Sequence, residues 1–516
     1  MRQFNTTGTC FPQIHYMVDI SRQVNDAVKM VKNNKYFCIN RGRQFGKTTT
    51  LNILQKTLAK EGYIVFSLSF EGLGDKEFES LESVCNKFMN LVKEQIQDDN
   101  VENISENLKS KFENFQPIND IAILKSIVKK ICSENPNIVV IIDEVDQASN
   151  HESFIKFLGF FRDLYLKRIQ TPTFQSLILA GVYNIKNLKL KMRPDDEHQY
   201  NSPWNIASSF ETDMSLHTDG IAKMLSDYKV DHNLEFDENH ISQKIYDWTS
   251  GYPYFVSRIC ELIDTKNLGW NDNGINEAVK YILSDSNDVL LEDFSKKLDD
   301  FPDLKQTLKM ILFEGYQIMY NPDEKYIKLG FLFNILKKEG NNIAVFNRIL
   351  ETRLYNLFFI ENKFEQLFNE GIKDKNQFTK NGFLDIQKIL EKFAIHFRDN
   401  YGDRDEKFIE KEGRKFFMLY LRPIINGASN YYIEAETRDY TRTDIIIDYQ
   451  SKQYIVEIKI WNGEEYNRKG EIQLSEYLDY YHLTEGYMLS FCFNKNKIPG
   501  AKTIEFGDKI LHEVIV

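Results

Sequence analysis

Two short stretches of the sequence carry residues whose types and spacing suit phosphate chemistry. Residues 36–50 form an apolar run, then a loop, then a helical pattern, and the loop ends Gly46-Lys47-Thr48. Phosphate binding needs a glycine so that backbone N–H groups converge, a lysine for the β- and γ-phosphates, and a hydroxyl for Mg²⁺. The helix that follows would point its positive dipole end at the phosphates. We therefore predict nucleotide-binding residues at Gly42, Gly46, Lys47, Thr48 and Thr49.

This loop departs from the usual pattern G-x-x-x-x-G-K-[ST] at one place. Arg41 stands at the first glycine position, and Gly42 is the candidate to take over that turn. Taken alone, the loop leaves a chance strand–turn–helix as the alternative.

A second stretch supplies the acids that the first one lacks. Residues 138–146 begin with five apolar residues and continue Asp143-Glu144-Val145-Asp146, which indicates a buried strand with carboxylates at its tip. Ligands of open α/β sheets bind at that edge. Asp143 would hold Mg²⁺ through water and Glu144 would polarise the attacking water, so ATP and Mg²⁺ are the predicted cofactors. A surface acid pair is the alternative.

A further apolar run, Leu177 to Val182, leads toward Asn184. A polar residue after this strand could touch the γ-phosphate, and Asn184 is the candidate. An ordinary loop asparagine is the alternative.

The C-terminal part carries a different set of residues. Asp444 opens one strand-like run, a turn follows near residues 450–451, and Glu457 and Lys459 lie on the next run. Side chains alternate along a strand, so Glu457 and Lys459 point the same way, and a hairpin places Asp444 beside Glu457. Asp444 and Glu457 would bind Mg²⁺ or Mn²⁺ through oxygen, and Lys459 would stabilise charge in phosphodiester hydrolysis.

Two helical residues complete this predicted metal site. Glu412, on the preceding helix, could complete the metal shell, with Glu410 as the competing choice, and Gln473 could orient a ligand or a phosphate. The alternative for the whole set is an amphipathic hairpin with an acid and a lysine on its wet face.

The elements that must position these residues change along the chain. Apolar runs at 36–39, 64–70, 138–142 and 177–182 alternate with helical patterns such as 48–60, which predicts a parallel sheet covered by helices. We predict an ATPase core at 1–204, a helical lid at 205–286, a helical linker at 287–374 and an α/β domain at 375–516. Within the last domain we expect a helix at 385–421, strands at 430–436, 444–449 and 453–460, a helix at 471–481 and a last strand at 486–493.

Composition narrows the class of protein. The chain has 516 residues, a net charge of -11 and 27% charged residues, so several soluble domains are expected. No run of about eighteen apolar residues and no signal-like start is present, so we expect no membrane span and a cytoplasmic location. None of the six cysteines has C-x-x-C spacing, which argues against a structural zinc site.

The sequence also resembles a known family. Residues 41–48 are similar to the R-P-R-R-F-G-K-S loop of bacterial AAA-ATPase-like proteins, which commonly end in a domain of the PD-(D/E)XK nuclease superfamily. The resemblance includes residues 16–19, 141–144, 179–183, 201–205 and 251–253, and Gly42 stands where that family often has proline. It implies an ATPase module with a helical lid near 251–253, from which Arg258 could reach the phosphates. A surface arginine is the alternative.

The C-terminal residues resemble the nuclease core in the order helix, strand, hairpin, helix. Asp444, Glu457, Lys459 and Gln473 match its motif, which implies a restriction-endonuclease-like α/β domain. The leading hypothesis is a metal-dependent nuclease gated by ATP in the same chain, acting on nucleic acid with DNA as the first choice, in a role such as defence or mobile-element control. The alternative is a nucleotide-switched DNA-binding protein without cleavage. ATPases of this broad class often assemble, so a homo-oligomer is expected.

Overall fold

A computed structural model gives the fold of the chain. It describes residues 2–98, 100–113, 117–148, 151–182, 206–285, 288–314, 318–360, 365–374, 377–380, 383–401, 410–425, 429–436, 442–449, 452–460, 464–492 and 500–516. The chain forms two compact units. The first unit comprises Met1–Lys297, Asn321–Glu339 and Ala344–Leu350, and the second comprises Leu298–Tyr320, Gly340–Ile343 and Glu351–Val516. The four domain ranges predicted from the sequence stay predictions.

The first unit is built on a five-stranded sheet. Its strands are β1 (Phe37–Asn40), β2 (Ile64–Ser69), β3 (Ile138–Asp143), β4 (Ser176–Gly181) and β5 (Ser208–Ser209), in the order β2-β3-β4-β1-β5. All neighbouring strands are parallel, so the predicted parallel sheet is confirmed. Every residue of β3 and β4 is buried, which explains their continuous apolar sequences. The order brings the carboxyl ends of β1, β3 and β4 to one edge.

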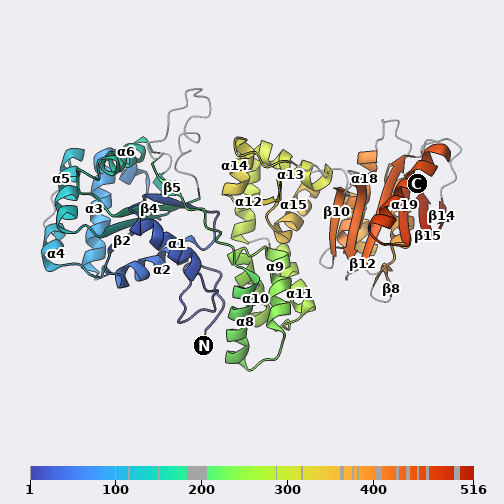
Figure 1. Ribbon diagram of the computed structural model, residues 1–516, viewed down its shortest axis with the longest axis horizontal. Helices are drawn as coiled ribbons and strands as arrows, with labels where there is room; N and C mark the ends of the chain where they lie inside the picture. The colour runs from blue at the N-terminus through green and yellow to red at the C-terminus, as the bar shows by residue number, and fades with distance from the viewer. Residues whose placement is uncertain are drawn as a thin grey trace. The chain divides into compact units, whose positions relative to one another are not determined.

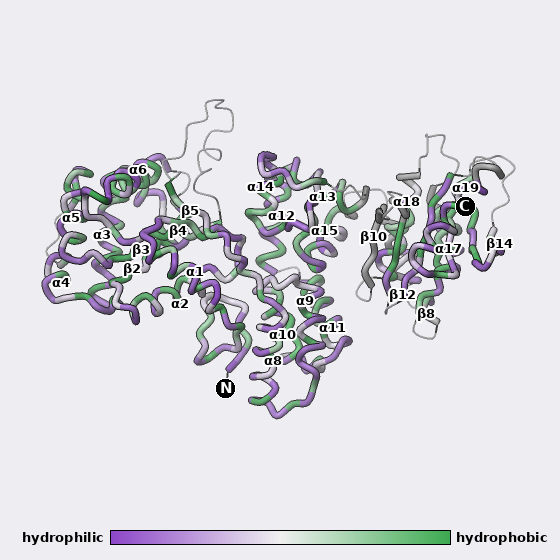
Figure 2. The backbone as a smooth tube through the Cα atoms, viewed as in Figure 1, coloured by the Kyte–Doolittle hydropathy of each residue, from purple (hydrophilic) through white to green (hydrophobic). Residues whose placement is uncertain are grey.

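Helices cover both faces of this sheet (Figure 1). One face carries α1 (Ser21–Lys32) and α2 (Lys47–Lys60), and the other carries α3 (Leu81–Gln97), α5 (Ile121–Glu134) and α6 (Glu152–Leu166). The short helices η1 (Asp75–Phe78), α4 (Glu106–Glu113) and η2 (Val145–Ala148) lie in the connections. The helices show alternating polar and apolar bands in Figure 2, as amphipathic helices on a sheet should.

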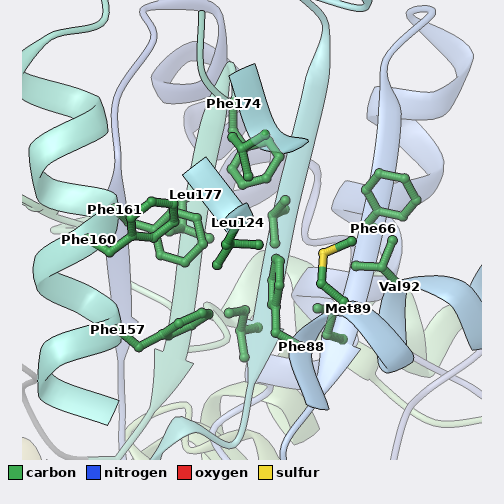
Figure 3. Packing of buried hydrophobic residues seen from close by; sticks show 14 of the residues in the cluster. Phe66, Phe88, Met89, Val92, Leu124, Phe157, Phe160, Phe161, Phe174 and Leu177 are labelled. Carbon is green, nitrogen blue, oxygen red and sulfur yellow. The ribbon is translucent and has the colours of Figure 1, made fainter. Parts of the chain in front are cut away.

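The core of this unit is rich in aromatic rings. Phe88 of α3 lies 5.4 Å from Phe157 and 5.7 Å from Phe161 of α6, measured between ring centroids (Figure 3). These rings pack on the apolar side chains of β2, β3 and β4. The packing fixes the strands, and therefore the loops at their carboxyl ends.

Helices follow the sheet along the chain. They are α8 (Thr218–His232), α9 (Glu238–Thr249), α10 (Pro253–Lys266) and α11 (Asp272–Ser284). Asn233, Ser250 and Asn267 end three of them in the left-handed conformation, and Pro253 begins α10 at a position that needs no N–H donor. The helical interpretation of this region agrees with the structure.

The next region differs from its sequence-based description. It contains α12 (Val289–Asp300), α13 (Pro302–Glu314), α14 (Lys325–Leu332), α15 (Arg348–Ile360) and α16 (Glu365–Asp374), but also the strands β6 (Leu336–Glu339) and β7 (Asn342–Val345). The predicted helices are present here, and the two short strands were not predicted. Gly340, between the strands, has φ +59°, and Ile343 and Val345 alternate with less buried residues.

The second unit contains a six-stranded mixed sheet in the order β10-β11-β12-β13-β15-β14. From residue 379 onward, the elements of this unit are β8 (Thr379–Lys380), β9 (Phe383–Leu384), α17 (Ile386–Tyr401), α18 (Glu410–Ile425), β10 (Ser429–Glu436), β11 (Arg442–Tyr449), β12 (Lys452–Ile460), α19 (Glu464–Tyr480), β13 (Glu485–Phe491), β14 (Gly500–Phe506) and β15 (Lys509–Ile515). The predicted order of helix, strand, hairpin, helix and strand is present. The single predicted helix at 385–421 is instead α17 and α18, and β14 and β15 were not predicted.

Helices lie on both faces of this mixed sheet (Figure 1). Phe393 and Phe397 of α17 pack against Phe491, and Gly413 of α18 approaches the same ring. On the other face, Leu474 and Tyr477 of α19 belong to a cluster that also holds residues of β12, β13 and β15. Among the described residues, none of the helices has the length and apolar character needed to cross a membrane.

Candidate nucleotide site and candidate metal site

The loop between β1 and α2 ends in a helix start suited to an anion. Gln44 has φ +54° and Gly46 has φ +79°, so the chain turns sharply before α2 begins at Lys47. Gly46 is the N-cap residue and offers no side chain to the first N–H groups of α2. Such N–H groups, together with the helix dipole, favour a phosphate at this place.

Lys47 reaches back across the loop. Its side chain is almost fully buried, and Nζ donates hydrogen bonds to the carbonyl oxygens of Arg41 at 3.2 Å and Gly42 at 3.1 Å. Burial lowers the pKa of the ammonium, while the carboxylates of Glu144 and Asp143 act in the opposite direction. The loop thus holds a cation over its own carbonyl groups, where an incoming phosphate can compete for it.

Thr48 and Asp143 bring two hard oxygen donors together. Thr48 Oγ1 donates a hydrogen bond of 2.8 Å to Asp143 Oδ2, and Asp143 is 7% exposed. The other carboxylate oxygen, Oδ1, accepts the backbone N–H of Glu144 at 2.9 Å. A hydroxyl and a carboxylate are donors that Mg²⁺ accepts directly or through water. The structure therefore brings together the two predicted metal-binding residues, and their chemistry fits the ion.

Glu144 has an unusual backbone. Its φ is +54°, a left-handed conformation that few side chains adopt without support. Burial raises the pKa of its carboxyl group, and the nearby Lys47 ammonium acts against that rise. A half-buried carboxylate with a raised pKa is a suitable acceptor for the proton of a water molecule.

Asp146 was not among the predicted site residues. Its Oδ2 accepts the backbone N–H of Val182 at 2.5 Å, and a Cβ at Gly181 would lie 2.9 Å from the same oxygen. Asp146 thereby ties the end of β3 to the end of β4. Its position three residues after Asp143 was the feature of the sequence from which a role at this site could have been predicted. Asn184, the γ-phosphate candidate, follows Val182 but lies outside the described residues.

Other loop residues serve the surrounding structure. Thr49 Oγ1 accepts the N–H of Cys10 at 3.1 Å, which ties α2 to the N-terminal segment. The Arg41 guanidinium donates to the carbonyl oxygens of Phe210 at 3.2 Å and Thr212 at 2.8 Å. Gly42 has no positive φ and lies instead against Phe333 and Asn334. The idea that Gly42 supplies the missing glycine turn is therefore wrong.

Arg258 lies on α10 and is paired within the helical region. Its Nη1 is 2.7 Å from Glu261 Oε2, and its Nη2 is 3.5 Å from an oxygen of Asp285. These polar partners of Arg258 lie on or just after the helices that follow the sheet, and neither belongs to residues 41–48. A phosphate role for Arg258 stays a prediction.

The C-terminal unit brings two of the predicted residues together. Lys459 Nζ lies 2.9 Å from Glu457 Oε1, and their side chains are 12% and 1% exposed. Both project from β12 toward α19, because the Lys459 side chain lies close to Gly470 of that helix. Burial of a carboxylate and an ammonium costs desolvation free energy, and buried charged groups of this kind often occur at functional sites.

Asp444 is placed by the strand register. Ile445 of β11 pairs with Val456 of β12 in antiparallel register. Asp444 and Glu457 are the next residues along the two strands, as the hairpin argument predicted. The side chain of Asp444 lies outside the described residues.

The two helical candidates lie on different helices over the sheet. Gln473 of α19 donates from Nε2 to the Tyr477 hydroxyl at 2.6 Å. Glu412 lies on α18, the helix whose Gly413 packs against Phe491 on the opposite face from α19, and its side chain is outside the described residues. Among the side chains that are described, no three of His, Cys, Asp and Glu gather as a metal site. The side chains of Asp444 and Glu412 are not among them.

A second buried carboxylate lies on the same face of the sheet. Glu513 of β15 accepts hydrogen bonds from Ser490 and, at 3.1 Å, from Asn467, and it is 2.6 Å from Lys502 Nζ. Met488 of β13 pairs with both Glu457 and Glu513, so one strand separates the two acids. Sequence reasoning missed Glu513 because β15 was not predicted.

Comparison with known proteins gives a family for the first part of the chain. A model of the AAA-like domain family matches residues 16–361. No curated protein matches the chain. Among solved structures, the Walker-type ATPase paby2304 of Pyrococcus abyssi is 12% identical with a TM-score of 0.46, covering 68% of this chain and 99% of that chain.

Two further solved structures are similar. The ORC2 protein of Aeropyrum pernix is 12% identical with a TM-score of 0.31, covering 66% of this chain and 93% of that one. Cdc6p of Pyrobaculum aerophilum is 13% identical with a TM-score of 0.32, covering 69% of this chain and 97% of that one. The family match spans more than half of the sequence, and the chain belongs to the AAA-like domain family.

Proposed function

We propose that the first unit binds ATP with Mg²⁺ and hydrolyses it. The observation that carries this proposal is the 2.8 Å hydrogen bond between Thr48 and Asp143, which joins the loop to the acid-tipped strand. Membership of the AAA-like domain family supports it. The two sequence motifs lie 95 residues apart, so a chance match would not bring their oxygens into contact.

Each residue has one role in the proposed reaction. Lys47 binds the β- and γ-phosphates, and the first N–H groups of α2 orient them. Thr48 and Asp143 would hold Mg²⁺, which when bound would neutralise phosphate charge. A water oxygen attacks the γ-phosphorus, and the bond between the γ-phosphorus and the β–γ bridging oxygen breaks. Glu144 accepts the proton of the attacking water. ADP and inorganic phosphate leave.

Measurement of ATP binding and turnover in matched variants tests this proposal. Lys47→Ala should lose ATP binding, because the buried cation is removed. Glu144→Gln should bind ATP but turn over at least about 100-fold more slowly. Lys60→Ala, at the exposed end of the same helix, serves as the charge-matched control. Full turnover in Glu144→Gln would show that another group accepts the proton, and full binding in Lys47→Ala would place the nucleotide elsewhere.

We further propose that the second unit is a metal-dependent nuclease controlled by the nucleotide site. The ion pair between Glu457 and Lys459 supports it, since a buried acid and lysine on one strand face suit metal-assisted hydrolysis. Asp444 and Glu457 would hold Mg²⁺ or Mn²⁺, and Gln473 would orient a phosphate of the substrate. The alternative is a nucleotide-switched DNA-binding protein that does not cut.

Cleavage assays distinguish these two functions. The full chain is incubated with linear and circular DNA, with and without Mg²⁺, Mn²⁺ and ATP. Asp444→Asn should abolish cleavage, while Asp448→Asn, on the same strand but opposite Gln453 at its other end, should not. Binding of DNA without cleavage under every condition favours the switch. Cleavage that survives Asp444→Asn excludes this metal site.

A further inference from the structure

Gly42 joins the phosphate loop to the turn that follows α14. Its backbone N–H donates a 2.5 Å hydrogen bond to Asn334 Oδ1, and its carbonyl oxygen accepts from Lys47 Nζ at 3.1 Å. One residue therefore connects the phosphate-binding lysine to a side chain 292 positions further along the chain. Both partners of this link belong to the first unit.

The approach at Gly42 leaves no space for a side chain. A Cβ at this position would lie 2.8 Å from the Phe333 carbonyl oxygen and 2.8 Å from Asn334 Oδ1. Asn334 is 7% exposed and adopts φ +55°, a conformation that asparagine tolerates better than most residues. The glycine and the asparagine thus fit one another, and the contact is sealed from water.

A second contact reinforces the first. Arg43 lies 3.7 Å from Asp293 of α12, and Asp293 also pairs with the buried Lys297. The Lys297 ammonium lies 4.6 Å from the centroid of the Phe333 ring, beside Asn334. Asn334 holds Gly42 and Asp293 holds Arg43, and Lys297 connects Asp293 to Phe333, the residue before Asn334.

We propose that this contact is a nucleotide-responsive latch, in which Asn334 holds the phosphate loop and releases it when ATP binds. The inference rests on the ATP site proposed above. Lys47 must turn toward the β- and γ-phosphates when ATP arrives, and it then gives up its bonds to the carbonyl oxygens of Arg41 and Gly42. The peptide unit that joins Arg41 to Gly42 carries both the Arg41 carbonyl and the Gly42 N–H, so it is then free to rotate, and that N–H leaves Asn334. Asn334 is a positioning residue here, since it acts through the loop.

Thermodynamic linkage sets the size of the effect. A contact that must break when ATP binds opposes ATP binding by its own strength, and ATP opposes the contact equally. A buried hydrogen bond of ordinary strength corresponds to a change in ATP affinity of about threefold to tenfold. The latch therefore changes the affinity for ATP only modestly. Its release upon ATP binding also changes the contacts of the turn at residues 333–335.

Amide hydrogen exchange and ATP binding in the full chain test the latch. The N–H groups of Phe333, Asn334 and Ile335 all donate to carbonyls of α14, so they are protected reporters. A non-hydrolysable ATP analogue should speed their exchange in the wild type. Asn334→Gly removes the acceptor and tolerates the positive φ, so its exchange should be fast without nucleotide, and it should bind the analogue about threefold to tenfold more tightly.

Asn334→Asp is the matched variant, since it keeps an acceptor oxygen at the same place. It should protect the three amides as the wild type does and bind the analogue no more tightly. Thermal unfolding checks that both variants fold. If the wild type binds the analogue but exchange at 333–335 does not change, the latch is refuted and the ATP site stands. Weaker binding by Asn334→Gly would also refute it. If the wild type binds no ATP, both proposals fail.

Discussion

The buried pair of Glu457 and Lys459 allows stability to be separated from catalysis. Removal of one partner leaves the other charge buried, which in proteins costs about 3–5 kcal/mol. The Lys459 side chain is 12% exposed and can reach some water, so we expect Glu457→Ala to destabilise the second unit by about 2–4 kcal/mol. For a unit of this size that corresponds to a fall in melting temperature of about 5–15 °C.

Removal of both charges should restore stability without restoring activity. In Glu457→Gln/Lys459→Met neither side chain carries a charge and the volumes are nearly kept. Its free energy of unfolding should lie within about 1 kcal/mol of the wild type, because buried pairs replaced by neutral groups are often neutral in stability. Cleavage of DNA should nevertheless fall to background, because the acid for the metal and the lysine for the charge are both absent.

Thermal unfolding of the second unit and metal-dependent cleavage are measured side by side for the single and double variants. A double variant that is as unstable as Glu457→Ala would refute the electrostatic account of the pair. A stable double variant that still cuts DNA would show that the pair is structural and that the nuclease assignment is wrong. Asp448→Asn controls for loss of a carboxylate on the neighbouring strand.

Two further predictions concern the nucleotide site. The pKa of Glu144 is raised, so ATP turnover should be lost as the pH falls, with a midpoint above pH 4.5. The pKa of Lys47 is lowered, so ATP binding should be lost as the pH rises, with a midpoint below pH 10.5. A pH profile of turnover and binding measures both midpoints, and a midpoint at the ordinary value of either group would contradict the corresponding prediction. Gly181→Ala should displace Asp146 from the Val182 N–H, and it should reduce the rate of ATP turnover more than the affinity for ATP. Steady-state kinetics measures the two effects separately. An unchanged turnover rate would show that Asp146 does not support the site.

The parts predicted well are those in which local sequence and burial agree. Strands β3 and β4 are buried on both faces, so their apolar runs are continuous and leave little choice of structure. The loop before α2 combines a glycine with φ +79° and the lysine that follows it directly, so neighbouring residues alone are enough to predict a phosphate-binding loop. The register at Ile445 and Val456 follows from alternation along a hairpin.

The parts missed depend on contacts between distant residues. β14 is largely exposed along its length and carries Lys502 and Glu505, so it lacks the apolar signal of a strand and is fixed by pairing with β15. Asn334 could not be found from the loop sequence, because the bond to Gly42 exists only once α14 has packed. Glu513 is buried by β13 and α19, and a lone acid in a C-terminal sequence gives no sign of that burial.

The missing first glycine of the phosphate loop has a structural explanation. A glycine is needed where φ is positive or where another backbone comes close, and Arg41 meets neither condition among the described residues. Its N–H donates to the Gly181 carbonyl at 3.2 Å, which extends the pairing of β1 with β4 by one residue, and its guanidinium turns away to bond with Phe210 and Thr212. The sheet therefore holds the start of this loop. A glycine is required instead at position 42, because the contact with Phe333 and Asn334 leaves no space for a side chain there. The departure from the motif thus reflects a loop that is anchored to the sheet at one residue and to the turn after α14 at the next.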